Sequence, residues 1–250
     1  MALKKVIIIA SFGSNRDMWL NPMLVNVRSK TTLPIVILTD MDKPYIHNFS
    51  EVTQQIIPEE QRLWMDNPRW GVRNTNYWLA KAALNYELSC CLNDDMRICT
   101  RDFEEGFDLA KRFGICVPMN PRIYVKYNAR GADTTNEDWS KTILTPFHVT
   151  ACNMSPMFVS SIHPSSKDLL DSYLIELQSC MRGTLAFWFA SWNTGITPLY
   201  LPEQWCVCAS NAKYIRDYKK VIQGQSVPIE PIMLHWGQQE VRNVFKDIMQ

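Results

Sequence analysis

The first 120 residues alternate between continuous apolar runs and segments with helical spacing of apolar side chains, and this alternation restricts the fold most strongly. Apolar runs occupy Val6–Ala10, Leu33–Pro44 and Ser89–Leu92, and the first of them is rich in β-branched residues. Such runs are typical of strands buried on both faces of a parallel sheet. The intervening segments Met18–Lys30 and Arg73–Leu88 have the spacing of crossover helices. The order predicts an α/β fold, with a single Rossmann-like, mixed, mostly parallel sheet flanked by helices.

Weaker patterns complete the expected order of elements. Asn74 or Thr75 is the expected N-cap of the second helix. The polar segment Asn128–Ser140 is expected to be a mobile surface loop. The other expected strands are Val52–Ile57, Ile115–Pro118, one near Met157–Val159, and short ones within Thr197–Cys208 and Glu230–Phe245. The other expected helices are Phe103–Arg112, stopped by Gly114, and Ser166–Met181. No repeat or low-complexity tract divides the chain, so a single domain, 1–250, is expected.

Composition excludes several classes of protein. A hydrophobic fraction of 46% is enough for a large core, and a net charge of +1 gives no general attraction to nucleic acid or anionic membranes. Eight cysteines without a Cys-X-X-Cys pair fit free core thiols better than a disulfide scaffold or a zinc knuckle. The run Val6–Ala10 is too short for a signal sequence, and no run reaches the roughly 18 apolar residues of a membrane span. We therefore expect a cytoplasmic protein without a membrane span.

Polar side chains follow three of the predicted strands at the point where each strand ends. Ser11-Phe12-Gly13 follows the first run, Thr39-Asp40 ends the second, and Asn93-Asp94-Asp95 follows the third. Parallel strands end at one edge of a sheet, where open α/β sheets bind their ligands, so these segments should converge. Carboxylates at that edge suit Mg²⁺ or Mn²⁺ and leave positions for phosphate oxygens. A simple surface turn is the alternative, because Asp-Asp pairs are common in turns.

The third strand, the acidic cluster and the following "MRICTRDFEEGFDLAKRFGICVPMNPR" resemble the central segment of metal-dependent glycosyltransferases with the A-type nucleotide-diphospho-sugar transferase fold. That family ends a core strand in an Asp-X-Asp motif, and Asn93 stands in place of its first aspartate here. The resemblance implies that Asp95 is the main metal ligand and that Asn93 is at best a weak one. It also implies that Asp94 assists the metal or contacts the ribose or the sugar.

Other segments extend the resemblance over nearly the whole chain. "MLHWGQ" resembles the family's C-terminal His-X-Gly segment, which implies that His235 is a second metal ligand and that a phosphate approaches Gly237 closely. "NMSPMFV", from Asn153 to Val159, resembles the Asn-Ser-Gly strand that lines the sugar pocket, and "LYLPEQWCV" resembles a late Leu-Pro stretch. Arg97 and Arg101 are expected mainly as exposed charges. The other implied contacts to the nucleotide sugar are Ala10, Ser11, Phe12, Gly13, Asp40 and the helix cations Arg73 and Lys81.

The function that the resemblance implies is enzymatic. A hexosyl- or pentosyltransferase of this kind moves a sugar from a nucleotide-diphosphate donor, here most simply a UDP-sugar, to an acceptor hydroxyl with the help of Mn²⁺ or Mg²⁺. Residues 1–120 would form the nucleotide-binding half, and residues 121–250 the acceptor and sugar half. The acceptor stays open between a glycan, a protein and a modified nucleic acid such as hydroxymethylated DNA. Candidates for a catalytic base follow from location alone, and they are Asp133, Glu137, Asp138 and Glu203.

Two other functions fit a related fold. A nucleotidyltransferase would make nucleotide sugars, but such enzymes carry a Gly-rich basic loop after the first strand, and "SFGSNRD" has one glycine and one arginine. A non-catalytic module could bind a nucleotide sugar without the chemistry, and Asn93 in place of an aspartate keeps this alternative open.

Overall fold

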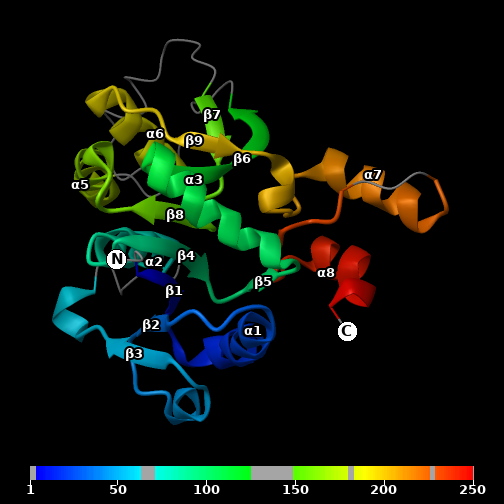
Figure 1. The fold of residues 1–250 in the computed structure, drawn as a ribbon, viewed down its shortest axis with the longest axis horizontal. Helices are drawn as coiled ribbons and strands as arrows, with labels where there is room; N and C mark the ends of the chain where they lie inside the picture. The colour runs from blue at the N-terminus through cyan, green and yellow to red at the C-terminus, as the bar shows by residue number, and fades with distance from the viewer. Residues whose placement is uncertain (1–3, 63–70, 125–148, 180–182, 226–228, 250) are drawn as a thin grey trace.

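A computed structural model describes residues 4–62, 71–124, 149–179, 183–225 and 229–249 of the chain. Eight of its strands form one sheet, in the order β3-β2-β1-β4-β8-β6-β7 with β9 also paired to β6 (Figure 1). These strands are β1 Lys5–Ser11, β2 Ile35–Thr39, β3 Val52–Ile56, β4 Leu88–Asn93, β6 Ile115–Tyr124, β7 Val149–Cys152, β8 Met157–Ser160 and β9 Leu199–Leu201. The sheet takes strands from both halves of the chain.

The register of the parallel strands aligns their carboxyl ends. Strands β3, β2, β1 and β4 are parallel neighbours, and Ser11 at the end of β1 pairs with Thr39 of β2. On the other side of β1, Ala10 pairs with Asn93 at the end of β4. Beyond β4 the sheet becomes mixed, because β8 runs antiparallel to both β4 and β6, while β9 is parallel to β6. The predicted α/β fold with a mixed sheet is confirmed.

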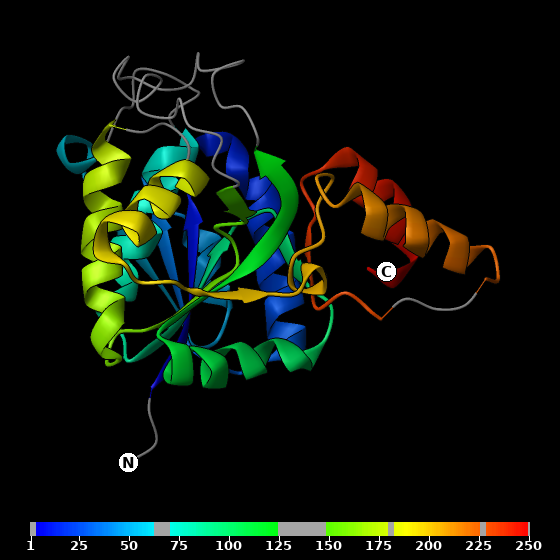
Figure 2. The same cartoon turned by 90° about the horizontal axis from the view of Figure 1, so that it is seen from above.

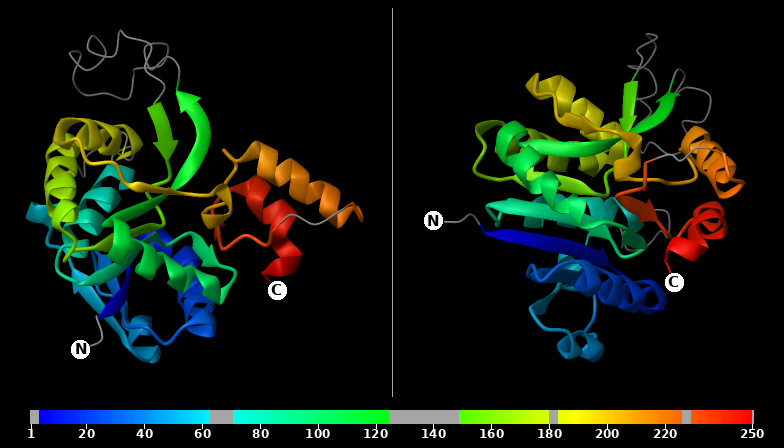
Figure 3. Two further views of the ribbon diagram at one scale, coloured as in Figure 1. Left: turned by 45° about the horizontal axis from the view of Figure 1, so that its top comes forward. Right: turned by 45° about the vertical axis from the view of Figure 1, so that its right-hand side comes forward.

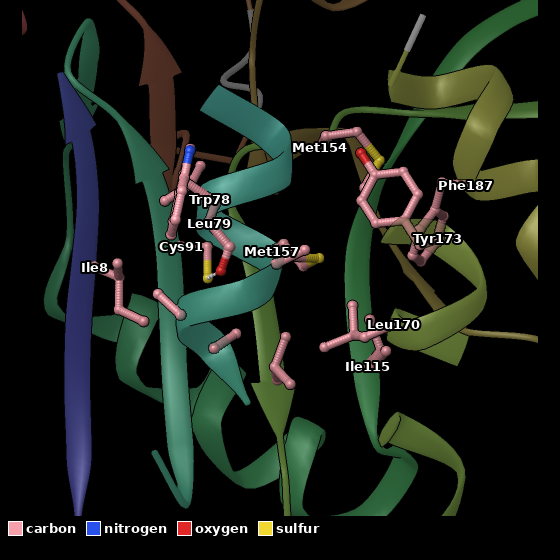
Figure 4. Close-up of a cluster of buried hydrophobic side chains, with 14 of the residues drawn as sticks. Ile8, Trp78, Leu79, Cys91, Ile115, Met154, Met157, Leu170, Tyr173 and Phe187 are labelled. Carbon is pink, nitrogen blue, oxygen red and sulfur yellow. Dashed lines mark hydrogen bonds between the residues drawn. The ribbon is translucent and has the colours of Figure 1, made fainter. Parts of the chain in front are cut away.

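Helices cover both faces of the sheet because the side chains of a strand alternate between its faces. Val6 and Ile8 of β1 belong to the core beneath α2 Gly71–Ala83, α5 Pro164–Ser179 and α6 Gly183–Thr194. Figure 4 shows part of this core, with Trp78, Leu79 and Tyr173 directed toward it from the helices. The opposite side chains of β1 belong to the core beneath α1 Asp17–Lys30 and α3 Glu105–Phe113 (Figure 2).

A two-stranded ribbon connects the main sheet to the C-terminal helices. Strand β5 Met96–Ile98 follows β4 closely and pairs antiparallel with β10 Met233–His235, so that Met96 lies opposite His235. Helices α7 Ala212–Ile222 and α8 Gln239–Phe245 share a third, smaller core beside the main sheet (Figure 3). The ribbon therefore brings the last fifth of the chain to the turn between β4 and β5.

Several predicted elements differ from the structure. The second helix begins at Gly71 and ends at Ala83, so Asn74 and Thr75 lie inside it and are not its N-cap. Asn74 is 3% exposed, and the packing of α2 outweighs the preference of its side chain for a cap. The segment Glu230–Phe245 contains one strand and then α8, not strands alone. Strands β5 and β7 and helix α7 were not expected.

Three further expectations concern the chain as a whole. The seven described cysteines are free and buried, as expected, and burial raises the pKa of the Cys91 thiol to about 12. None of the described helices combines the length and the apolar character that a membrane crossing requires. The loop expected at 128–140 lies outside the described residues.

Candidate active site

The turns after β1 and β2 and the end of β4 meet at one edge of the sheet, as predicted. The Ser11 hydroxyl donates a hydrogen bond of 2.8 Å to Oδ2 of Asp94, which links the ends of β1 and β4. The backbone N–H of Gly13 donates to Oδ2 of Asp40 over 2.9 Å, which links the ends of β1 and β2. Gly13 has φ +101°, a backbone conformation that residues with a side chain rarely adopt, so the turn depends on glycine. The acidic cluster is therefore part of a connected site.

Arg16 holds Asp94 at this edge and was not among the expected site residues. It lies in the 3-10 turn Ser14–Arg16 after β1, and its Nε donates to Oδ2 of Asp94 over 2.8 Å while Nη2 pairs with Oδ1. The Asp94 side chain is 2% exposed, and burial raises its pKa although Arg16 and Ser11 act in the opposite direction. Both oxygens of Asp94 are thus engaged by protein donors. Its expected role toward a metal or a ribose stays a prediction.

Asp95 and His235 form the second pair of the site. Oδ1 of Asp95 lies 3.2 Å from Nε2 of His235, and both side chains are largely buried. Burial works against ionisation of Asp95, but the contact with His235 and the charge of Arg16 outweigh burial and hold the pKa of Asp95 below its usual value. The ribbon of β5 and β10 creates this contact between residues that are far apart in the sequence.

Gly237 is required beside this pair for a steric reason. A Cβ atom on Gly237 would lie 2.5 Å from Oδ2 of Asp95, and its backbone N–H donates to the Asp95 carbonyl over 3.1 Å. The expected role of Gly237 was a close approach to a phosphate. The structure shows that the missing side chain makes room for the Asp95 carboxylate, and the approach of a phosphate stays a prediction.

The atoms of this pair fit a divalent cation. Two neighbouring ligands of an octahedral ion with bonds of about 2.1 Å lie about 3 Å apart, close to the 3.2 Å between Asp95 and His235. No described residue donates a well-aligned hydrogen bond to Oδ1 of Asp95 or to Oδ1 of Asn93, although both oxygens are buried. Within the described ranges no group of three His, Cys, Asp or Glu side chains could hold an ion. A cation here would need the Asn93 oxygen, water or a bound ligand to complete its shell.

Arg97 is buried beside the acidic pair, and the expectation that it is an exposed charge is wrong. It is 5% exposed, because β10 and its helices cover β5, whereas Arg101 is exposed as expected. Nη1 donates to the Met96 carbonyl over 2.6 Å, and no described carboxylate forms an ion pair with the guanidinium. Burial lowers the pKa of Arg97 to about 10, while Asp95 and Asp94 act against this shift. Among the described residues, a group that is charged at neutral pH is therefore buried here without a direct counter-ion.

The segment around Asn153 packs against the end of β4. The backbone N–H of Asn93 donates to Oγ of Ser155 over 2.8 Å, which joins this segment to the acidic cluster. The Asn153 amide nitrogen lies 3.8 Å from the sulfur of Cys208. Asn153 is thus near the site, as the sequence suggested, and Ser155 is an additional member that the sequence did not single out.

Other expected site residues are placed elsewhere. Nε of Arg73 donates to the Leu177 carbonyl on α5, so the guanidinium lies between two helices. Lys81 is exposed near the end of α2, with Nζ 4.6 Å from the centre of the Trp78 ring. Because α2 leads back to the start of β4, its end lies away from the acidic cluster. Glu203 begins the 3-10 turn Glu203–Trp205, and its charge acts on Tyr214. The expected residues outside the described ranges are Asp133, Glu137 and Asp138.

Comparisons with known proteins agree with this geometry at the level of the fold. The chain matches no protein-family model and no curated protein. The apo structure of the bifunctional glycosyltransferase WbbM is similar with a TM-score of 0.63 and 10% identity over 100% of this chain, which spans only about half (49%) of that protein. The galactosyltransferase LgtC, solved with donor and acceptor sugar analogues, has a TM-score of 0.59 and 11% identity over 98% of this chain and 95% of its own. Mouse xyloside xylosyltransferase 1 has a TM-score of 0.52 and 10% identity over 92% of this chain and 97% of its own.

The alignments to these neighbours cover 92–100% of this chain, but the sequence identity of 10–11% is too low to transfer an activity. The likeness therefore concerns the backbone alone. The fold of this chain is that of the A-type glycosyltransferases.

Proposed function

We propose that the protein transfers a sugar from a nucleotide-diphosphate donor to an acceptor hydroxyl, assisted by Mg²⁺ or Mn²⁺. The observation that carries the proposal is the approach of Asp95 and His235 to 3.2 Å at the carboxyl edge of a glycosyltransferase fold. Open α/β sheets bind ligands at this edge, and a carboxylate with an imidazole suits either ion.

Each described side chain has a role in this proposal. Asp95 and His235 hold the cation, which when bound neutralises charge on the diphosphate leaving group. The Arg97 guanidinium supplies a second positive charge toward the same group. Arg16 and Ser11 fix Asp94 and so hold the end of β4 in place. The turn of Gly13 and Asp40 faces the nucleoside, and Asn153 faces the donor sugar.

A UDP-sugar is the donor that we favour, and a glycan hydroxyl is the acceptor. LgtC has a similar fold over its whole length and was solved with donor and acceptor sugar analogues. A protein or a modified nucleic acid presents the same hydroxyl chemistry, so these acceptors are tested alongside glycans.

The test is the release of nucleoside diphosphate from a panel of nucleotide sugars in the presence of Mn²⁺ or Mg²⁺. A transferase releases nucleoside diphosphate, faster with its acceptor present. A nucleotidyltransferase instead consumes a sugar phosphate and a nucleoside triphosphate and releases diphosphate. A binding module retains the nucleotide sugar without release. Either of the last two results would overturn the proposal.

Matched variants test whether this activity depends on Asp95 and His235. Asp95→Ala and His235→Ala should each lose metal-dependent turnover by 10–100-fold or more. Because both act through one ion, the double variant should be little worse than either single one. Asp171→Ala and His47→Ala remove the same groups from a half-exposed and an exposed position on other elements and should keep full activity. Full activity of His235→Ala with an unchanged metal requirement would show that His235 only packs.

A further inference from the structure

Gln238 connects His235 to the backbone of a neighbouring turn. Its Oε1 accepts a hydrogen bond from the backbone N–H of Ala209 over 2.5 Å. Its Nε2 lies 3.3 Å from Nδ1 of His235, on the side of the ring opposite the Asp95 carboxylate. The Gln238 side chain is thus held from one end and contacts the imidazole with the other.

The direction of these hydrogen bonds follows from the backbone. A backbone N–H can only donate, so the Gln238 group that faces Ala209 must be the carbonyl oxygen. The group that faces the imidazole is then the NH₂, which is a donor only. Nδ1 of His235 must accept this bond, and in the neutral ring the proton then resides on Nε2. The nitrogen that carries this proton lies 3.2 Å from Oδ1 of Asp95.

This polarity is the reverse of the one that metal-binding histidines usually have. A ring that binds a cation through Nε2 needs its lone pair there, and its Nδ1–H usually donates to a carboxylate, a carbonyl or water. With Gln238 held by Ala209, an Nδ1–H would face a second donor. Binding at Nε2 therefore requires the Gln238 amide to turn and to release the Ala209 N–H.

We propose that Gln238 is a positioning residue that keeps His235 in the Nε2–H tautomer while the site is free of metal, and so weakens cation binding. This inference rests on the metal site of the proposed function. The Ala209 N–H belongs to a tight turn in which the Cys208 sulfur lies 2.9 Å from Oδ1 of Asn211. Rotation of the amide therefore couples cation binding to this turn.

Gln238→Glu reverses the polarity with almost no change in shape. A carboxylate accepts from the Ala209 N–H with one oxygen and from an Nδ1–H of His235 with the other, so nothing needs to rotate. The variant should place the ring proton on Nδ1 and bind Mg²⁺ about tenfold more tightly or better. Gln239→Glu is the matched control, because it adds the same charge one residue away, where the side chain contacts Asn243.

Nitrogen-15 NMR of the histidine rings in metal-free protein tests the tautomer directly, at a pH where the imidazole is neutral. The His235 signals are assigned by their loss in His235→Ala. We expect Nε2–H in the wild type and in Gln239→Glu, and Nδ1–H in Gln238→Glu. Wild-type protein with its proton on Nδ1, or Gln238→Glu with an unchanged tautomer, would overturn the inference.

Calorimetric titration with Mg²⁺ supplies the second readout. Tighter binding in Gln238→Glu but not in Gln239→Glu supports the inference, whereas an equal gain in both would attribute the effect to charge alone and overturn it. If Gln238→Glu fails to fold, Gln238→Met replaces it, and the expected loss of the donor should then allow both tautomers. The NMR result does not depend on turnover, so an inactive protein with the expected tautomer would count against the proposed function and not against this inference.

Discussion

Arg16→Ala tests whether the turn after β1 stabilises the acidic end of β4. The variant removes both contacts from the guanidinium to Asp94 and leaves Ser11 as the remaining side-chain donor to this buried carboxylate. Removal of one partner of a buried ion pair typically lowers the free energy of unfolding by about 3–5 kcal/mol. The Arg16 side chain is 35% exposed, so water can reach the carboxylate after truncation. Because water screens the exposed carboxylate, we expect the free energy of unfolding to fall by only about 2–3 kcal/mol at neutral pH.

The pH dependence of this loss has a definite sign. Burial already raises the pKa of Asp94, and removal of Arg16 should raise it further. A carboxyl group with a raised pKa in the folded state contributes stability below the unfolded pKa and loses it as the pH rises through the folded pKa. The difference between Arg16→Ala and the wild type should therefore shrink as the pH falls toward about 4, where unfolded Asp takes up its proton.

Urea unfolding of both proteins at neutral and at acidic pH measures this effect. Arg16→Lys keeps the charge but not the paired geometry and should lie between the two. Arg16→Ala combined with Asp94→Asn should recover part of the loss, because the double variant leaves no unpaired charge. A loss below about 0.5 kcal/mol for Arg16→Ala, equal at both pH values, would show that the pair behaves as an ordinary surface ion pair and would refute the reasoning.

Three further substitutions give distinct expected results. Gly237→Ala should weaken Mg²⁺ binding by about tenfold or more, because the new Cβ displaces the Asp95 carboxylate; unchanged affinity in a calorimetric titration would contradict this. Arg97→Met should leave stability equal or higher, because it removes a buried charge, yet weaken UDP binding by about tenfold or more. Thermal unfolding and calorimetry separate these two effects, and unchanged UDP affinity would exclude Arg97 from the diphosphate site. Gly106→Ala should lower the free energy of unfolding by about 1–3 kcal/mol, since its Cβ would lie within 2.6 Å of the Phe158 ring, and urea unfolding checks it.

The sequence predicted the strands of the parallel half because their burial on both faces leaves a local signal. The runs at Val6–Ala10 and Ser89–Leu92 have no polar alternation, and each became a strand with nearly the expected bounds. The ribbon of β5 and β10 has no such signal. Met96–Ile98 is three residues long, carries an arginine in its middle, and is stabilised by a partner strand from far along the chain. Pairings of this kind depend on tertiary context and not on local propensity.

The contrast between local sequence signals and tertiary contacts also explains which residues of the candidate site could be anticipated. The place of Asp95 at the sheet edge was predictable because it follows a strong strand pattern, and strand ends have a known place in such sheets. Arg16 and Gln238 were missed because their roles follow from contacts with Asp94 and His235, which depend on the folded arrangement. Arg97 was expected to be exposed because nothing in its neighbourhood indicated that the C-terminal helices cover β5.

Under the proposed function, the charges of the site favour joint binding of cation and donor. Asp94 and Asp95 contribute two negative charges, and Arg16 and Arg97 contribute two positive charges close to them. The four charges nearly cancel, so a bare divalent cation gains little from the protein beyond its direct contacts with Asp95 and His235. A diphosphate brings its own negative charge, which attracts both the cation and the Arg97 guanidinium. The tautomer that we propose Gln238 imposes on His235 acts in the same direction, because it would weaken the site for a cation that arrives alone. The proposed function therefore predicts a cation that arrives with its nucleotide and not one that is held permanently.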